Sequence, residues 1–442
     1  MYDKQYFNDF LESQLKIKIQ EKATYGEVFT PLAIIDEKLA SLPPSYWKSP
    51  EKRWLDPACG IGNYMIKAIL GGEGYPGLFA GLQSKIRNPA KRLEHIVSMF
   101  TLYDINESNV QTAIQLLKKL APDSKPNVIH GDFLAMAPTN PQVHYDIILG
   151  NPPYNLQGTK RKGTKRVHVD FVKAALPLLT HDGHLLFVCP PNYREHGSTM
   201  NQLFRQDGGH FVYIRILGPD ETLKIFKIQS RIDIFLYCKT PNPKAKTHIV
   251  DLYGHDSHQT LSLDRHIPNF GHSIFEKLRK SPPAQIHAFR NTEATTIHCA
   301  KSGLSNKGTH PILHLIVEGG RRVLRRKTPH SLQHRRKIFL NGLGLPYVYY
   351  DQKGIYGPSQ TPVIILDPPQ KLVQFMKTPF FTFLAWALRI TGNNNLPYLF
   401  DDVPADYAEE LTLTKEEQQL VDKFQHYKFD DKDIPIDCKD SE

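Results

Sequence analysis

The sequence predicts an α/β protein, with a doubly wound, mainly parallel sheet in its N-terminal half and a second, mixed α+β domain after it. Two observations lead to this fold class. Between residues 52 and 240, short apolar segments alternate with amphipathic helical patterns, which is typical of β-α-β units. From about residue 245 this alternation stops, and PNPKAK at residues 241–246 is typical of a linker.

The individual elements follow from the same patterns. About the first 20 residues form a candidate amphipathic helix. Asn106 is a candidate N-cap for a helix with apolar residues at helical spacing, and Pro177 is expected to bend or shorten the helix that contains it. Phe211–Leu217 and Ile232–Tyr237 have no long helical pattern between them, so we expect an antiparallel pair. The preceding strands are predicted at Arg53–Leu55, Ile96–Tyr103, Val128–His130, Asp146–Leu149 and His184–Cys189.

Composition excludes several classes of protein. Of 442 residues, 40% are hydrophobic and 23% are charged, which is typical of a globular chain. No apolar run reaches the ~18 residues of a membrane span, and the N-terminus has no apolar core of a signal peptide. The five cysteines include no CxxC pair, and the histidines show no HExxH pattern. We therefore expect no disulfide framework, no metal, no membrane contact and a cytoplasmic or nucleoid-associated protein of bacterial, archaeal, plasmid or viral origin.

Charge is distributed unevenly around a net value of +10. Residues 301–340 contain ten Lys or Arg and one acid, whereas residues 401–442 contain fourteen acids and five Lys. A basic block in a folded protein indicates nucleic-acid binding, and on charge alone a solvated loop explains it equally well.

Three motifs follow predicted strands. Residues 55–64, LDPACGIGNY, join a strand end to an acid and a Gly-x-Gly turn, as a nucleotide-like cofactor requires. Asp104 ends the second strand, where an acid can hold ribose hydroxyls. Asp132 and Phe133 follow the third strand, where they can accept from an adenine amino group and stack on its ring. Taken singly, each motif has an ordinary alternative: a tight turn after the first strand, a helix-start residue at Asp104, and an Asx turn with a core Phe at Asp132 and Phe133.

The most specific motif is GNPPY at residues 150–154, after the fourth strand. Prolines lack an N–H group and fix the backbone, so the Asn151 side-chain oxygen and the Pro152 carbonyl would form a pair of acceptors. Tyr154 adds a flat face for a planar base. A Pro-Pro turn is the alternative for this motif alone, but four motifs at one sheet edge favour a binding site for a planar amino group.

Together these motifs resemble the gamma class of S-adenosylmethionine-dependent N6-adenine DNA methyltransferases, with the cofactor motif first, NPPY next and target recognition last. TYGEVFTP at residues 24–31 is similar to the motif that closes over the cofactor in TaqI-like and Eco57I-like enzymes. Residues 223–239 are similar to the segment that places an aromatic residue, here Phe226, on the flipped base. The resemblance extends over about residues 20–240 and implies a Rossmann-like doubly wound methyltransferase sheet ending in an antiparallel strand pair.

The resemblance also implies residue roles. Asn151 and Pro152 accept from the target amino group, and Pro153 is the next residue of the same catalytic motif. Tyr154 and Phe226 sandwich the flipped adenine. The residues implied to bind S-adenosylmethionine are Tyr25, Phe29, Thr30, Pro31, Asp56, Ala58, Cys59, Gly60, Gly62, Asp104, Ile105, Asp132, Phe133 and Asn151. One departure is Tyr64, where the family usually has Phe.

Three domains are predicted: a cofactor-binding catalytic domain over residues 1–245, a target-recognition domain over residues 246–404 and an acidic tail over residues 405–442. The tail is expected to be solvated, and the alternatives are that it repels DNA from the wrong face or docks on the basic block when DNA is absent. The expected DNA contacts form two basic groups, in which aromatic residues accompany the second. They are Lys160, Arg161, Lys162, Lys165 and Arg166, and then Arg321, Arg322, Arg325, Arg326, Arg335 and Arg336. Duplex DNA is the expected partner, bound by a monomer, with a separate cognate restriction endonuclease or none.

Several alternatives share NPPY chemistry. Protein-glutamine and RNA-adenine methyltransferases resemble this chain, but they are generally shorter and lack the segment at 24–31 and a large recognition domain. A non-catalytic DNA-binding subunit is disfavoured by the intact glycine turn and NPPY motif. A fused restriction enzyme is disfavoured because only about twenty residues precede Thr24.

Overall fold

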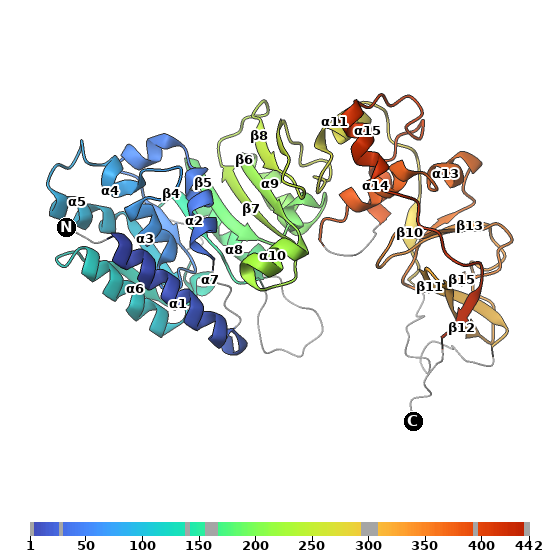
Figure 1. The fold of residues 1–442 in the computed structure, drawn as a ribbon, viewed down its shortest axis with the longest axis horizontal. Helices are drawn as coiled ribbons and strands as arrows, with labels where there is room; N and C mark the ends of the chain where they lie inside the picture. The colour runs from blue at the N-terminus through green and yellow to red at the C-terminus, as the bar shows by residue number, and fades with distance from the viewer. Residues whose placement is uncertain are drawn as a thin grey trace. The chain divides into compact units, whose positions relative to one another are not determined.

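The computed structural model describes residues 4–25, 30–137, 142–154, 167–292, 308–391 and 397–436. The chain divides into two compact units, Met1–Ile267 and Pro268–Glu442, which Figure 1 colours from blue to yellow and from yellow to red. The boundary therefore falls after residue 267, and not after residue 245 as predicted, because two further strands follow the predicted linker and join the first sheet.

The first unit is built on a nine-stranded sheet of order β3-β2-β1-β4-β5-β7-β6-β8-β9. The first five strands are parallel, and β7 runs antiparallel to both β5 and β6, which confirms the predicted doubly wound sheet with its antiparallel pair. The strands are β1 (Trp54–Asp56), β2 (Phe100–Asp104), β3 (Asn127–His130), β4 (Tyr145–Gly150), β5 (Leu179–Cys189), β6 (His210–Leu217), β7 (Ile232–Cys238), β8 (Thr247–Val250) and β9 (Asp256–Gln259).

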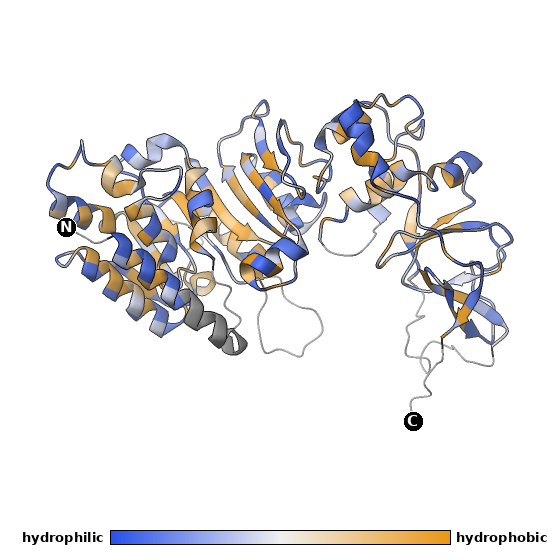
Figure 2. Cartoon of the chain, in the orientation of Figure 1, coloured by the Kyte–Doolittle hydropathy of each residue, from blue (hydrophilic) through white to orange (hydrophobic). Residues whose placement is uncertain are grey.

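Helices cover both faces of this sheet. One hydrophobic cluster joins the sheet to α1 (Lys4–Tyr25), α2 (Leu32–Ala40), η1 (Pro44–Lys48), α3 (Asn63–Leu70), α4 (Gly77–Gly81), α5 (Pro89–Ser98), α6 (Glu107–Leu120) and α10 (Pro219–Phe226). A second cluster joins the opposite face to α7 (Phe133–Met136), α8 (Val167–Ala175), η2 (Leu176–Leu178), η3 (Asn192–Arg194) and α9 (Thr199–Asp207). Figure 2 shows the apolar strands between helices whose outer sides are hydrophilic.

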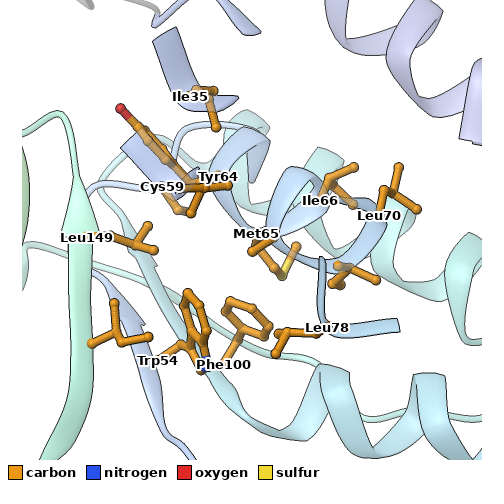
Figure 3. Close-up of a cluster of buried hydrophobic side chains, with 14 of the residues drawn as sticks. Ile35, Trp54, Cys59, Tyr64, Met65, Ile66, Leu70, Leu78, Phe100 and Leu149 are labelled. Atoms are coloured by element: carbon orange, nitrogen blue, oxygen red, sulfur yellow. The ribbon is translucent and has the colours of Figure 1, made fainter. Parts of the chain in front are cut away.

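The strand sequences explain this layered arrangement. In β4, Ile147 and Leu149 belong to the first cluster, whereas Ile148 belongs to the second. Successive side chains of a strand point to opposite faces, so a strand buried on both faces reads as a continuous apolar run. Figure 3 shows the first cluster, in which the Trp54 and Phe100 rings from β1 and β2 lie 5.4 Å apart.

One local prediction changes, and two others are confirmed. Ile96 was predicted within a strand, but it lies in α5, which Asn88 caps by accepting a hydrogen bond from the Lys91 amide. Leu93 and Ile96 occupy the buried side of that helix, so the helical spacing outweighs the apolar run. The helix before Pro177 ends at Ala175 and continues as the short turn η2. The Asn106 cap of α6 is confirmed, since its side chain accepts from the Ser108 amide.

The second unit contains two four-stranded sheets of order β10-β16-β13-β14 and β15-β11-β12-β17, with short helices. The strands are β10 (Ala288–Arg290), β11 (His310–Val317), β12 (Gly320–Arg326), β13 (Lys337–Leu340), β14 (Val348–Asp351), β15 (Gly357–Pro358), β16 (Val363–Leu366) and β17 (Asp433–Pro435). The helices are α11 (His272–Leu278), α13 (Gln370–Phe375), α14 (Pro379–Ala387), η4 (Pro397–Asp402) and α15 (Lys415–Asp422).

The acidic C-terminal segment was predicted to be solvated, with docking on the basic block as an alternative, and it folds onto the second unit as far as residue 436. The Phe424 ring stacks on Phe270 at 5.3 Å, and β17 pairs in parallel with β12. Both Asp431 and Asp433 form ion pairs with Arg321. Carboxylates of the acidic segment therefore neutralise part of the basic block. None of the described helices could cross a membrane.

Candidate functional site

The candidate site lies at the carboxyl ends of β1 to β4, which are adjacent in the order β3-β2-β1-β4. This register brings Asp56, Asp104, Asp132 and Asn151 to one edge of the sheet, although they are separated by up to 95 positions in the sequence. Ligands of open α/β sheets bind at this edge.

The glycine turn after β1 is fixed to the end of β2. Gly60 and Gly62 have φ values of +54° and +87°, which favour glycine, and a Cβ at Gly62 would lie 3.2 Å from Met65 Cε. The Gly60 amide donates to Asp104 Oδ2 at 2.8 Å, and the Cys59 amide donates to the Tyr103 carbonyl at 2.8 Å. The turn therefore opens α3 with its backbone held against β2.

Asp56 is a buried carboxylate with one oxygen left over. Its Oδ1 accepts from the Ala58 amide at 3.1 Å, whereas Oδ2 has no hydrogen-bond partner among the described residues. Burial raises the pKa of Asp56 to about 7, opposed by the Ala58 amide and by nearby Lys38. A Cβ at Gly150 would lie 2.9 Å from Oδ1, so glycine is needed here to let β4 pass the carboxylate. The open acceptor fits a ligand that brings an N–H, an O–H or a positive charge.

The raised pKa predicts a pH-dependent stability. An unfolded Asp titrates near 3.9, whereas folded Asp56 has a pKa of about 7. Between these pH values the carboxyl group is ionised in the unfolded state and still protonated in the folded state. The free energy of unfolding therefore falls as the pH rises from about 4 to about 7. Asp56→Asn removes that charge, and its melting temperature is expected to exceed the wild-type value by a few degrees at pH 8 and by less at pH 5. The measurement is a thermal melt without ligand across this range. Asp132→Asn, at an exposed position, serves as the control, and an equal offset at both pH values would contradict the prediction.

The groups predicted to hold a nucleoside are arranged differently from expectation. Asp104 already accepts from Gly60, from the Asn106 amide at 2.9 Å and from Asn109 Nδ2 at 3.2 Å. The Asp104 carboxylate, at the carboxyl end of β2, thus also holds the glycine turn after β1 and the start of α6 in place. Asp132 is exposed and caps α7 through the Leu134 amide at 2.9 Å.

Phe133 was predicted to pack on the cofactor ring, but its own ring lies in the core. It is 3% exposed, stacks on Phe171 at 5.7 Å and contacts Tyr103 edge-on at 5.4 Å. The exposed apolar side chains at this edge are Ile105, at 70%, and Met136, at 50%. Ile105 was predicted from the sequence, whereas Met136 was missed. An apolar ring would therefore find Ile105 and Met136 available at this edge.

The Asn151 carboxamide is held at both ends. Its Nδ2 donates to Thr30 Oγ1 at 3.1 Å, and its Oδ1 accepts from the Tyr154 hydroxyl at 2.9 Å. A carbonyl oxygen has two lone pairs, so the Asn151 oxygen is an acceptor of the kind that a substrate N–H requires. Pro152 is buried and Pro153 is exposed.

Tyr154 is itself fixed by the segment that begins α8. Its carbonyl accepts from the Val167 amide at 3.1 Å and contacts His168 Nδ1 at 3.3 Å, while His168 Nε2 lies 2.9 Å from Asn192 Oδ1. Phe226, the last residue of α10, is buried in the first cluster, and Tyr154 packs against the same cluster. The two aromatic residues predicted to hold a base thus share one hydrophobic region.

Other predicted residues are placed as follows. Tyr25 ends α1, Pro31 is the N-cap residue of α2, and Ala58 is half-buried. Phe29 lies outside the described residues. So do Lys160, Arg161, Lys162, Lys165 and Arg166.

Sequence reasoning missed Lys38. Lys38 is fully buried on α2, with its Nζ 2.7 Å from the Tyr64 hydroxyl and 3.0 Å from the Gly150 carbonyl. A signal was present, because Lys38 interrupts the apolar side of α2 formed by Ile34, Ile35 and Leu39. Among the described residues, no group of three or more His, Cys, Asp or Glu is placed to hold a metal ion.

The basic residues of the second unit differ in availability. Arg321 is buried, forms ion pairs with Asp431 and Asp433, and lies over the Tyr349 ring. It was predicted to contact DNA, but its charge is neutralised within the unit. Arg335 pairs with Asp367. On β12, Arg322 and Arg325 are exposed and Arg326 is half-buried. Arg336, directly before β13, is also exposed.

The chain matches one family model and is similar to several known proteins. Residues 28–214 match the family described as "RMKL-like, methyltransferase domain". The chain is similar to the type II methyltransferase M.VspI of Vibrio sp. (strain 343), with 24% identity over 192 residues, covering 41% of this chain and 40% of that protein. It is also similar to two solved structures. One is the methyltransferase subunit of a type I restriction-modification system from Streptococcus thermophilus, with a TM-score of 0.36 and 15% identity, covering 51% of this chain and 47% of that chain. The other is the DrdV–DNA complex, with a TM-score of 0.49 and 10% identity, covering 96% of this chain and 59% of that chain.

The chain spans less than two thirds of the length of each of these proteins. The family match over residues 28–214 supports a methyltransferase domain there, with S-adenosylmethionine as its cofactor. The site fits this cofactor, because the open Asp56 oxygen and the exposed Ile105 and Met136 side chains offer a polar and an apolar contact along one sheet edge.

Proposed function

We propose that this protein transfers a methyl group from S-adenosylmethionine to the N6 amino group of an adenine in DNA. The observation that carries the proposal is the Asn151 carboxamide, whose oxygen is oriented by Tyr154 and whose nitrogen is tied to Thr30, one strand away from the open Asp56 oxygen. We further propose that the chain acts as the modification enzyme of a restriction-modification system, with a separate endonuclease, or as an orphan enzyme.

The chemistry requires activation of a poor nucleophile. The adenine N6 lone pair is delocalised into the ring, and two acceptors on the two N–H bonds favour a localised lone pair. Asn151 Oδ1 and the Pro152 carbonyl would supply these acceptors, and positioning with electrostatics would supply most of the rate. When bound, the cofactor supplies an electrophilic methyl group.

A duplex base cannot reach such a pocket from within the stack. We therefore propose that the target adenine is flipped, at a cost of a few kcal/mol that stacking on aromatic side chains offsets. Tyr154 and Phe226 are the proposed stacking residues, since both border the same hydrophobic cluster. Phe226 is 3% exposed, so a base would have to displace the groups that cover it.

The direct test is transfer of a labelled methyl group from S-adenosylmethionine to duplex DNA, single-stranded DNA, RNA and a release-factor protein. We expect label in duplex DNA as N6-methyladenine, and mapping of the modified sites would give the recognition sequence. Label only in RNA or protein would retain the chemistry and overturn the substrate. Absence of label with the cofactor bound would overturn the proposed activity.

The two exposed arginines of β12 provide a test of DNA binding by the second unit. Arg322→Ala with Arg325→Ala is expected to weaken DNA binding and to reduce the slope of log K against log salt by about 2, one for each lost phosphate contact. Arg321→Ala is expected to leave the salt slope unchanged and to lower stability instead, because it breaks internal ion pairs. A salt titration of binding for each variant would decide, and equal slopes for the double variant and the wild type would exclude contact by this strand.

A further inference from the structure

We propose that Lys38 and Tyr64 are positioning residues that fix the Asn151 carboxamide, an inference that rests on the proposed function. Four hydrogen bonds connect Lys38, through Tyr64 and Thr30, to Asn151 and Tyr154. Lys38 Nζ donates to the Tyr64 hydroxyl at 2.7 Å, and that hydroxyl donates to Thr30 Oγ1 at 3.2 Å. Thr30 Oγ1 also accepts from Asn151 Nδ2 at 3.1 Å, and Asn151 Oδ1 accepts from Tyr154 at 2.9 Å. We call this chain of five side chains the Lys38 relay.

The direction of donation in the Lys38 relay orients the amide. Lys38 Nζ donates to the Tyr64 oxygen, so the single hydrogen of the Tyr64 hydroxyl remains for Thr30 Oγ1. Thr30 then presents a remaining lone pair to the Asn151 nitrogen, which leaves the amide oxygen facing Tyr154. Without the Tyr64 hydroxyl, the Thr30 hydroxyl is free to turn and donate its own hydrogen, which would accommodate a flipped carboxamide.

The relay also holds the backbone of the NPPY motif. Lys38 donates a second hydrogen bond to the carbonyl of Gly150, the residue directly before Asn151. The buried Lys38 amine therefore holds this motif in two ways: directly, through the Gly150 carbonyl, and indirectly, through the side chains of the Lys38 relay. Lys38, Tyr64 and Thr30 are exposed by 0%, 4% and 4%, so water does not replace any of these bonds.

A stability role does not account for a lysine at this position. Burying an amine costs free energy, and burial lowers the pKa of Lys38 well below its usual value. An apolar side chain beside Ile35 and Leu39 would complete the α2 face without that cost. Figure 3 shows the Tyr64 ring within the hydrophobic cluster with its hydroxyl pointing away from Met65 and Phe100. The polar groups thus face the site, while the hydrocarbon parts serve the core.

The test compares Tyr64→Phe with Tyr75→Phe. Tyr75 belongs to the same cluster and is 6% exposed, but its hydroxyl donates to Asp36 Oδ1 at 2.7 Å and lies 3.2 Å from the Lys67 carbonyl oxygen, away from the relay. We expect Tyr64→Phe to lower kcat about 10-fold or more on whichever substrate the wild type methylates. KM for that substrate and Kd for S-adenosylmethionine are expected to stay within about 2-fold. Tyr75→Phe is expected to leave kcat unchanged.

A double variant separates positioning from stability. Lys38→Met and Tyr64→Phe each leave one partner of their shared bond unsatisfied and are expected to lower the melting temperature. The double variant removes both partners of that bond and is expected to recover the melting temperature in part, because the Gly150 carbonyl still lacks its donor. We expect kcat of the double variant to remain low, because Thr30 is still released. Recovery of kcat together with the melting temperature, or a kcat of Tyr64→Phe within 2-fold of wild type, would overturn the proposal.

A spectroscopic measurement tests the relay independently of activity. In the full chain labelled with [15N]asparagine, the side-chain NH2 signals of Asn151 are assigned by their loss in Asn151→Ala. We expect a sharp pair in the wild type and in Tyr75→Phe, and a shifted or broadened pair in Tyr64→Phe. Unchanged signals would reject the relay even if methyl transfer occurs, and changed signals would retain it even if the proposed substrate is incorrect.

Discussion

Replacing Asn151 by alanine is expected to reduce kcat for methyl transfer about 10²- to 10³-fold. Removal of one preorganised polar group from a water-excluded reacting centre has an effect of this size. The substitution removes one of the two proposed acceptors and also leaves Thr30 Oγ1 and the Tyr154 hydroxyl without their amide partner. Asn151 is also among the residues implied to bind S-adenosylmethionine, but Asp56 and Asp104 remain in place, so we expect the Kd for the cofactor to change much less than kcat.

The matched control is Asn127→Ala. Asn127 is an exposed asparagine on β3 whose side chain donates to Thr101 Oγ1 at 3.0 Å, at the end of that strand opposite to the candidate site. Single-turnover transfer and calorimetric binding of the cofactor should be measured for both variants. An Asn151→Ala rate within 3-fold of the control would show that the reacting centre lies elsewhere.

Replacing Arg194 by methionine is expected to lower the free energy of unfolding of the first unit by about 3–5 kcal/mol. Arg194 and Asp233 are both fully buried, with Nε and Oδ2 at 2.6 Å and Nη2 and Oδ1 at 3.2 Å. Asp233 also accepts from the Tyr193 hydroxyl at 2.8 Å, opposite Cys189 at the end of β5. Loss of Arg194 leaves the buried Asp233 carboxylate without its cation. The expected loss of about 3–5 kcal/mol is a large fraction of the free energy of unfolding of a typical domain.

Urea unfolding followed by tryptophan fluorescence can measure this effect. Trp47 and Trp54 report on the first unit if Trp386 in the second is replaced by phenylalanine in every variant. Arg205→Met serves as control, because Arg205 and Asp264 form an exposed pair whose loss should cost less than about 1 kcal/mol. Adding Asp233→Asn to Arg194→Met should recover much of the loss, since no charge then stays buried. Equal destabilisation by Arg194→Met and Arg205→Met would contradict the argument.

Local patterns predicted the elements that are defined by neighbours in the sequence. The helical spacing after Asn106 and the apolar run of β5 each specify an element whose position the structure reproduces. The strand predicted at Ile96–Tyr103 fails at its start, because an apolar run longer than one strand does not reveal where a helix ends. The strands β8 and β9 were missed because they carry no apolar alternation strong enough to stand out after the Pro-rich turn.

The candidate site divides in the same way. The sequence by itself determined which residues follow the carboxyl ends of β1 to β4, because the alternation of strands and helices requires a parallel sheet and a parallel sheet gathers those ends at one edge. It left two alternatives undecided that the structure settles: Phe133 lies in the core, and Arg321 is neutralised by Asp431 and Asp433. Burial and pairing depend on what packs against a side chain, and no local period records that.

Only the tertiary structure decided how Lys38, Tyr64, Thr30 and Asn151 meet. Thr30 and Asn151 are 121 positions apart, and Lys38 and Gly150 are 112 apart, yet each pair shares a hydrogen bond. Such contacts arise when α2 packs over the end of β4, which depends on the whole hydrophobic cluster and not on either segment. The sequence therefore determined the order of elements and the polar residues at their ends, while packing determined which of those residues hold one another in place.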